Sequence, residues 1–122
     1  MRVKRPMPPA VADRLAADLA GARSSARMGD SAQAWRLLEE AHILSQPWAR
    51  PHVRVHVAMA GRGWRLRDRH EVLGQLLRIV VAGPGSLTGR YPEGNTGRAS
   101  VPATAPMPVP EELRALLGSP SP

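Results

Sequence analysis

Three of the four histidines of this chain, His42, His52 and His56, fall within fifteen residues of sequence. The periodicity of the flanking apolar residues places them on two helices joined by a short turn near Trp48. In an antiparallel helical hairpin, residues equidistant from the turn lie side by side, so His42 is expected between His52 and His56. The sequence therefore predicts a site at which one metal ion contacts three imidazoles.

The spacing of these residues matches known patterns of metal ligands. His52 and His56 are four residues apart, so their ring nitrogens converge on one face of a helix. Glu39 precedes His42 by three residues, the Glu-x-x-His spacing of di-iron bundles, but those bundles use the motif twice and it occurs once here. We expect a mononuclear zinc, nickel, copper or iron site in which the histidines ligate and Glu39 ligates or orients an imidazole. The alternative is that the histidines hydrogen-bond to each other, to Glu39 or to the backbone.

Other reaction chemistries lack their residue patterns. The chain has no cysteine, which excludes thiolate metal sites, disulfides and thiol nucleophiles. His70 and Glu71 begin like the metalloprotease motif H-E-x-x-H, but Gly74 stands where the second histidine is required. Glu71 is instead expected to complete a capping box with Asp68. No serine has the surroundings of a nucleophile elbow, so the sequence favours a binding protein over an enzyme and leaves activity open.

The chain is strongly basic, with 17 Lys and Arg, 10 Asp and Glu and a net charge of +7. Such a charge attracts nucleic acid, but the arginines are spread over every segment, so nucleic-acid binding is retained as a further alternative. No stretch has the roughly 20 continuous apolar residues of a membrane span, and the N-terminal residues lack the apolar core of a secretory signal. These features predict a cytoplasmic protein without a membrane partner.

Apolar periodicity and capping residues predict an all-α fold of about four helices. The first helix begins at Pro9, the second follows an N-cap at Asp30, the third begins near Pro51, and the fourth follows Asp68 and ends at Gly83-Pro84. The predicted organisation is a basic Pro-rich arm at 1–8, a helical domain at 9–83, a Pro/Gly-rich segment at 84–109, a short amphipathic helix at 110–118 and a tail at 119–122. The Pro/Gly-rich segment is expected to be either an extended wrap or disordered.

Several residues are candidates for contact with a partner. Trp48 in the turn and Tyr91 in the Pro/Gly-rich segment are the aromatic candidates. The terminal helix is expected to dock on the bundle or on a partner through Leu113, Leu116 and Leu117. The fourth helix has an apolar face that needs a cover. We expect either the C-terminal segment to cover this face or the protein to form a homodimer there.

A weak repeat relates two of the expected helices. Trp35-x-x-Leu38-Glu39-x-x-His42 recurs as His70-x-x-Leu73-Gly74-x-x-Leu77. This spacing resembles the first helix of a tetratricopeptide unit, W-x-x-L-G-x-x-Y, over about residues 35–80, although Glu39 replaces the small residue and Gly63 replaces the closing proline. The resemblance implies a tetratricopeptide-like helical hairpin with a groove for a protein partner.

A second resemblance covers most of the chain. The run from AWRLLEEAHILSQ through EVLGQLLR to PGSLTGRYPEGNTGR and PMPVPEELRALL is similar to a family of small bacterial proteins known only as a domain of unknown function. That family supplies no activity, so the resemblance supports the helical fold and adds no site residues. The sequence thus predicts a non-catalytic helical binding module with a candidate transition-metal site. The alternative is a metal-free, tetratricopeptide-like adaptor for protein interaction.

Overall fold

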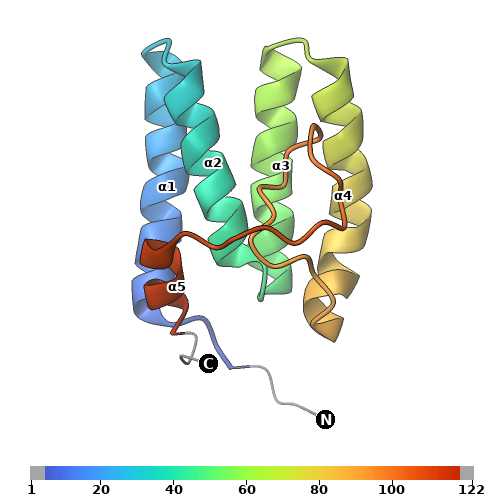
Figure 1. Cartoon of the computed structure of the whole chain (residues 1–122). Coiled ribbons are helices and arrows are strands. Elements are labelled where there is room, and N and C mark those ends of the chain that lie inside the picture. Colours follow the sequence, from blue (N-terminus) through green and yellow to red (C-terminus); the bar gives the residue numbers. More distant parts are fainter. Residues whose placement is uncertain (1–4, 119–122) are drawn as a thin grey trace.

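The computed structural model describes residues 5–118, and within this range the chain forms five α-helices and no strand. The helices are α1 (Pro9–Arg27), α2 (Ser31–Ser45), α3 (Ala49–Arg65), α4 (Arg69–Thr88) and α5 (Glu111–Leu117). Figure 1 shows two helical hairpins side by side, α1 with α2 and α3 with α4, and a C-terminal segment that crosses to the short α5. The predicted all-α class is therefore confirmed. The predicted tail at 119–122 and residues 1–4 of the predicted arm lie outside the described residues.

Side-chain caps begin α2 and α4, as the sequence predicts. Oδ1 of Asp30 accepts a hydrogen bond from the backbone N–H of Gln33 at 3.0 Å, and Oδ1 of Asp68 accepts one from the backbone N–H of Glu71 at 3.0 Å. Each bond satisfies an N–H group that the first turn of a helix leaves without an intrahelical partner. Pro51 lies in the first turn of α3, where its missing N–H costs no helical hydrogen bond.

The end of α4 differs from the prediction. The expectation that Gly83-Pro84 ends the fourth helix is wrong, because the helix continues through Pro84 to Thr88. A proline inside a helix costs about 3 kcal/mol, since it removes one hydrogen bond and its ring clashes with the preceding turn. The last turn of α4 is nevertheless held by buried Ser86, whose hydroxyl donates to the carbonyl of Gln46 at 2.5 Å. Tertiary contacts therefore outweigh the local preference of proline.

The apolar core consists of two clusters that are built largely on α1 and α2 and are completed by residues of α3, the C-terminal wrap and α5. One cluster comprises Leu15, Ala22, Trp35, Leu38, Ala41, Val55 and Met59, and the other comprises Val11, Ile43, Leu44, Val109 and Leu113. Leu113 of α5 is 2% exposed, and Leu116 and Leu117 pack against the second cluster. The terminal helix therefore docks on the bundle, which is one of its two expected positions. Each fully buried Leu side chain contributes about 1.5–3 kcal/mol, so hydrophobic burial holds this part of the fold together.

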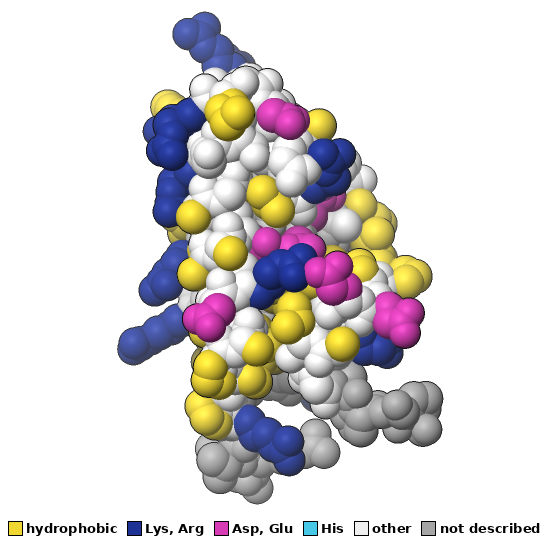
Figure 2. Space-filling model, turned by 90° about the vertical axis from the view of Figure 1, so that its left-hand side faces the viewer, with side chains coloured by type: hydrophobic (Ala, Val, Ile, Leu, Met, Phe, Trp, Pro, Cys, Tyr) yellow, Lys and Arg dark blue, Asp and Glu magenta, His cyan; other side chains and the backbone are white. Residues whose placement is uncertain are grey.

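Arg14 links three helices through ion pairs. Its guanidinium lies 2.9 Å from Glu40 of α2, 2.7 Å from Glu112 of α5 and 3.4 Å from Asp18 of α1. Asp18 is 3% exposed, and burial, together with the nearby Glu40, raises the pKa of its carboxyl group to about 8. Figure 2, which looks onto the α1 side, shows acidic and basic side chains interspersed, with a row of basic side chains along one edge. Charged contacts therefore help to hold α5 beside α1 and α2.

The α4 helix buries polar residues and exposes apolar ones. Its buried residues are Glu71, Gln75, Arg78, Ala82 and Ser86. They recur every three or four residues and so share one face of the helix. The opposite face carries Leu73, Leu76, Leu77, Val80, Val81 and Leu87, all more than half exposed. Most residues that make the sequence of α4 look apolar therefore point away from the bundle.

Residues 89–110 form an extended wrap without a helix. Asn95 organises this wrap, because its Nδ2 donates to the carbonyl of Pro102 at 2.9 Å and to that of Ala105 at 2.8 Å. The wrap lies against the polar face of α4, where the carbonyl of Val101 accepts a hydrogen bond from Arg78 at 2.9 Å. The C-terminal segment therefore leaves the apolar face of α4 uncovered.

Candidate metal centre

His42 of α2 and His52 and His56 of α3 meet in the interior, where they are 3%, 4% and 2% exposed. The Nε2 atom of His42 lies 3.0 Å from that of His52 and 3.1 Å from that of His56. The Nε2 atoms of His52 and His56 are 3.1 Å apart. The three histidines therefore meet, as the sequence predicts, but at nearly equal separations, so that His42 forms one corner of a triangle and does not lie between the other two. The three imidazoles form a group that is able to hold a metal ion.

The C-terminal wrap orients His42. Its Nδ1 lies 2.6 Å from the backbone carbonyl oxygen of Asn95, and because a carbonyl oxygen accepts but cannot donate, this nitrogen carries the proton. Gly97 packs against the same ring with a φ of +84°, and a Cβ atom there would lie 2.6 Å from Cδ2 of His42. A side chain at residue 97 would therefore be both strained and in collision with the imidazole.

The last turn of α4 orients His52. Its Nδ1 lies 2.8 Å from Oγ of Ser86. The hydroxyl of Ser86 donates its proton to the carbonyl of Gln46, so its oxygen accepts from Nδ1–H of His52. Because Ser86 lies beyond Pro84, the continuation of α4 past the proline supplies this contact.

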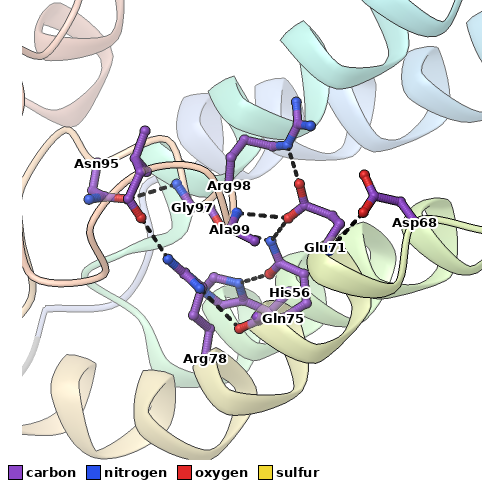
Figure 3. A network of polar contacts seen from close by, with 11 residues as sticks. His56, Asp68, Glu71, Gln75, Arg78, Asn95, Gly97, Arg98 and Ala99 are labelled. Atoms are coloured by element: carbon purple, nitrogen blue, oxygen red, sulfur yellow. Dashed lines mark hydrogen bonds and ion pairs between the residues drawn. The ribbon is translucent and has the colours of Figure 1, made fainter.

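Gln75 of α4 orients His56. The Nδ1 atom of His56 lies 2.6 Å from Oε1 of Gln75. The Nε2 amide group of Gln75 donates to the carboxylate of Glu71 and to the carbonyl of Gly97, both at 2.7 Å. Figure 3 shows these contacts in one network. Because the amide nitrogen faces two acceptors, Oε1 must face the imidazole and accept its Nδ1 proton.

All three Nδ1 atoms are therefore hydrogen-bond donors. In a neutral imidazole, protonation of Nδ1 leaves Nε2 with a lone pair and no proton. Three such lone pairs converge within 3.0–3.1 Å of one another in the interior. Partial negative charges at this separation repel each other, and a cation placed among them would offset this repulsion.

Burial keeps two of these imidazoles neutral. It lowers the pKa of His42 well below the ordinary value, and the neighbouring His56 and His52 lower it further, against the effect of the hydrogen bond to Asn95. Burial also lowers the pKa of His56, and the positive charge of Arg78 acts in the same direction. A proton is therefore a poor occupant of the centre at neutral pH, whereas a metal ion uses the deprotonated nitrogens.

Glu71 anchors the residues around the centre. Its carboxylate accepts hydrogen bonds from Arg98 at 2.6 Å, from Gln75 at 2.7 Å and from the backbone N–H of Ala99 at 2.8 Å. Burial raises the pKa of this carboxyl group, but these hydrogen bonds and the charge of Arg98 outweigh burial, so the pKa is lowered. The expected capping box is therefore half formed: Asp68 caps the helix, while the Glu71 carboxylate turns toward the C-terminal wrap (Figure 3).

Glu39 does not join the three histidines. Within residues 5–118, the group of potential ligand atoms that lie within 4.8 Å of one another contains the three imidazoles and no carboxylate. Burial raises the pKa of Glu39. The positive charge of Arg98 lowers this pKa, and the negative charge of Glu71 raises it, but the net shift is upward. The structure thus brings together three of the four predicted ligands. The orienting role expected of Glu39 is filled by Asn95, Ser86 and Gln75.

A cavity of about 320 Å³ opens beside the imidazoles. All three histidines line it, together with buried Arg78, half-buried Tyr91 and the exposed side chains of Leu77 and Val81. The cavity therefore places a space of the size of a small molecule next to the three imidazoles.

The two aromatic candidates for partner contact lie in different surroundings. Trp48 packs against the second apolar cluster, and its Nε1–H donates to the carbonyl of Arg5 at 2.9 Å. Tyr91 lines the cavity beside the histidines, and burial raises the pKa of its hydroxyl group. Trp48 therefore covers the core, while Tyr91 adjoins the candidate site.

Sequence reasoning missed the residues that orient the imidazoles. Gln75 and Ser86 lie on one face of α4 with Glu71 and Arg78. A stripe of polar residues at helical spacing was therefore an available signal. The backbone carbonyl of Asn95 gave no signal, because a main-chain group carries no trace of its partner in the sequence.

Comparison with known proteins identifies a family and no function. No curated protein and no solved structure matches this chain. One family model matches residues 9–117, a range that contains all five helices and the whole histidine centre. The chain therefore belongs to the family described as "Protein of unknown function (DUF3703)".

Proposed function

We propose that the protein binds one divalent transition-metal ion, of zinc, nickel, copper or iron, through the Nε2 atoms of His42, His52 and His56. The observation that carries this proposal is the occupation of all three Nδ1 atoms by hydrogen-bond acceptors, which directs three lone pairs at one point. An acceptor on the outer ring nitrogen is typical of metal-binding histidines, because it selects the tautomer and holds the ring. The lack of cysteine in the chain and of carboxylates in the group favours a metal that accepts neutral nitrogen ligands.

The separation of the Nε2 atoms suits a single ion. With metal–nitrogen distances of about 2.0–2.1 Å, nitrogens 3.0–3.1 Å apart subtend about 95° at the metal. This is close to the angle between neighbouring ligands in an octahedral complex, so the histidines occupy one face of the coordination sphere. Centres with three protein ligands keep a position open for water or for a substrate.

Hydrogen bonds donated by Nε2 of His42 or His56 do not account for the arrangement. For its Nε2 to donate, a neutral histidine must accept a hydrogen bond at Nδ1. The Nδ1 partners of His42 and His56 are a carbonyl and an amide oxygen, which have no proton to donate. Burial lowers the pKa of both residues, which disfavours their doubly protonated forms. One metal ion satisfies all three nitrogens at once.

A metal-free protein-interaction adaptor is the second candidate, and the exposed apolar face of α4 favours it. In this reading the α2–α3 hairpin is tetratricopeptide-like. Gly74 stands at the glycine position of the tetratricopeptide motif. In this fold its lack of a side chain lets the C-terminal wrap approach α4, since a Cβ atom at Gly74 would lie 2.5 Å from Cβ of Ala99. The two candidates differ in their response to metal: an adaptor keeps the same melting temperature with added metal or chelator.

The test is elemental analysis of untagged protein purified without chelator, followed by zinc titration against a competing chelator. We expect about one metal ion per chain in the wild type and none in the His52→Ala/His56→Ala variant, because three converging ligands are reduced to one. Wild-type protein that carries no metal and takes up no zinc, nickel, copper or iron would overturn the proposal.

His70→Ala is the matched control. His70 is the fourth histidine, and it is exposed at the start of α4. This variant is expected to keep the metal content and zinc affinity of the wild type. Circular dichroism of all variants separates loss of the metal from loss of the fold.

A further inference from the structure

Resting on the proposed metal centre, we infer that the cavity beside it binds a small organic carboxylate. The carboxylate completes the coordination of the metal, and its apolar part lies against α4. Three observations carry this inference: the charge of the centre, the buried Arg78 and the lining of the cavity.

The centre has an excess of positive charge once a metal is bound. Three neutral imidazoles leave a divalent ion with both of its charges. Arg78 lines the same cavity and is 8% exposed, and its guanidinium donates to the carbonyls of Gly74 at 3.1 Å and Val101 at 2.9 Å. Among the ion pairs of the described residues, none includes Arg78. Buried charges are normally paired with an opposite charge, so an anion is the expected occupant.

The nearest carboxylate of the chain does not neutralise this charge. Glu71 is the acidic group that acts on the pKa of Arg78, but its carboxylate is already paired with Arg98 at 2.6 Å. One metal ion, two arginines and one glutamate leave a net positive charge around the cavity. The bound molecule is therefore an anion.

The lining of the cavity selects the kind of anion. Its volume of about 320 Å³ lies at the lower end of the range for ligand sites, which is roughly 300–1,000 Å³. Leu77, Val81 and Pro92 line it beside the polar groups. An inorganic anion leaves these apolar walls in water, whereas a carboxylate with a short hydrocarbon chain covers them.

Carboxylates of increasing length test this inference on the wild-type protein. The protein is loaded with cobalt(II), whose visible absorption changes when a ligand enters its coordination sphere, and is titrated with acetate, butyrate, hexanoate and azide. We expect each carboxylate to change the spectrum and the affinity to rise about fourfold per methylene group that reaches the apolar wall. Equal affinities for acetate and hexanoate, or a response to azide alone, would overturn the assignment to an organic carboxylate.

Arg78→Gln tests the role of the buried charge. We expect it to weaken hexanoate binding at least tenfold and to change cobalt affinity less than threefold. Arg69→Gln, at an exposed position on the same helix, is the matched control and is expected to leave both unchanged. If Arg78→Gln fails to fold, the chain-length series on the wild type still decides the inference. Absence of cobalt binding defeats the proposed function, whereas a cobalt complex that no carboxylate perturbs defeats this inference alone.

A separate observation concerns the exposed face of α4, and we propose that a second copy of this chain covers it. With about 100° per residue, Leu73, Leu76, Val80 and Leu87 fall in one sector directly opposite the buried polar stripe. Trp64, at the end of α3, is 75% exposed. At roughly 100 Å² per exposed side chain, these residues with Leu77 and Val81 offer on the order of 700 Å², close to the roughly 800 Å² that each partner buries in a standard interface.

The charge distribution favours a copy of the same chain. Between His70 and Arg90 the only charged residues are Glu71 and Arg78, and both are buried. The α4 part of this face has no exposed charge and is complementary to itself, which a two-fold symmetric dimer requires, and interface centres are depleted of charge. Arg67, Asp68 and Arg69 lie beside Trp64 at one end of the face. Membrane-surface helices instead carry Lys and Arg on their polar face, whereas the polar face of α4 is turned inward. Within the described residues, no helix is long and apolar enough to cross a membrane.

Sedimentation equilibrium tests the dimer. We expect a mass of about twice 13.2 kDa for the wild type and a monomer for Val80→Glu, because a charge at the centre of the face repels its symmetric copy. Met28→Glu is the control, since Met28 is 82% exposed at the opposite hairpin and the variant is expected to remain dimeric. A wild type that stays monomeric at its highest soluble concentration would overturn the proposal, as would a monomer that binds anionic phospholipid vesicles through this face.

Discussion

The two helical hairpins are built on opposite principles. The α1–α2 hairpin packs apolar side chains inside, with Val11 and Leu44 fully buried. The α3–α4 hairpin places His52, Gln75 and Ser86 inside, and its helix α4 turns its leucines and most of its valines outward. Apolar burial stabilises any arrangement that packs well, whereas a polar interior is stable only when each buried group finds a partner. The first hairpin therefore serves mainly as a scaffold, and the second, together with His42 of α2, defines a specific constellation of polar groups.

The polar hairpin meets this requirement closely. Within residues 5–118, the buried side-chain atoms without a hydrogen-bond partner are Oδ2 of Asp18, Nε of Arg62 and Oγ1 of Thr96. Arg62 lies on α3, but none of the three atoms belongs to the side chains that orient the histidines, whose own Nε2 atoms face one another. A polar interior satisfied in this detail specifies one geometry, and a binding site benefits from that property more than a scaffold does.

The largest expected effect is that of metal on the thermal stability of the whole chain. A ligand at about 1,000 times its dissociation constant stabilises the native state by about 4 kcal/mol. We therefore expect saturating zinc to raise the melting temperature by about 10 °C or more over protein in chelator. Differential scanning calorimetry measures this change. The same increase in the His52→Ala/His56→Ala variant would show that zinc acts outside the polar hairpin.

Leu38→Ala tests the apolar hairpin. Leu38 is 4% exposed in the first cluster, and its truncation leaves a cavity that costs about 2–5 kcal/mol. Urea denaturation is expected to show this loss of unfolding free energy, while the zinc affinity of the folded variant stays within about threefold. A large fall in zinc affinity would mean that the scaffold and the centre are coupled.

Gln75→Leu tests the polar hairpin in the same two measurements. The change removes the acceptor of His56, one of the donors to Glu71, and the Gln75 donor to the carbonyl of Gly97. We expect a loss of about 1–3 kcal/mol in stability and of about 10–100-fold in zinc affinity. Gln33→Leu, on α2, is the matched control and is expected to change neither. Unaltered zinc affinity in Gln75→Leu would contradict the orienting role of this residue.

A pair of glycine substitutions compares the turn of the apolar hairpin with the wrap that covers the histidines. Gly29 and Gly97 have nearly the same φ, +82° and +84°, but a Cβ at Gly29 meets nothing within 4 Å while one at Gly97 meets the ring of His42. Gly29→Ala is expected to cost about 1–2 kcal/mol from the backbone alone. Gly97→Ala adds the collision, so it is expected to be less stable than Gly29→Ala and to bind zinc more weakly. Equal stability and equal zinc affinity in the two variants would count against the packing of the wrap on His42.

The smallest effect concerns pH and the one buried carboxyl group of α1. Because burial raises the pKa of Asp18 to about 8, the native state holds a proton that the unfolded chain releases near pH 4. This contribution to stability is present below about pH 4 and is lost as the pH rises toward about 8. Asp18→Asn mimics the protonated form, so its melting temperature, measured in chelator, should fall less over this range than that of the wild type. Asp13→Asn, at an exposed position of α1, should retain the wild-type slope, and an identical slope in Asp18→Asn would refute the assignment.

Local signals in the sequence determined the helices and the meeting of the histidines. Asp30 and Asp68 mark helix starts because a side-chain oxygen one residue before a helix satisfies its free N–H groups. His42, His52 and His56 were predictable as a group because a short turn between helices fixes which residues face each other. Both inferences depend on interactions between near neighbours in the chain, which a sequence displays directly.

The tertiary structure decided which face of α4 is buried and what orients the imidazoles. Apolar periodicity shows that α4 has two different faces, but the partners of Gln75 and Ser86 lie 19 and 34 residues away in the chain, and no local pattern encodes them. The same contacts carry α4 past Pro84, against its local preference. The position of Asn95 depends on the path of the C-terminal wrap, whose turns follow from hydrogen bonds to backbone carbonyls. Polar contacts across such distances exist only in the assembled fold. They hold the three imidazole rings in one orientation and determine that Nδ1 of each ring carries the proton.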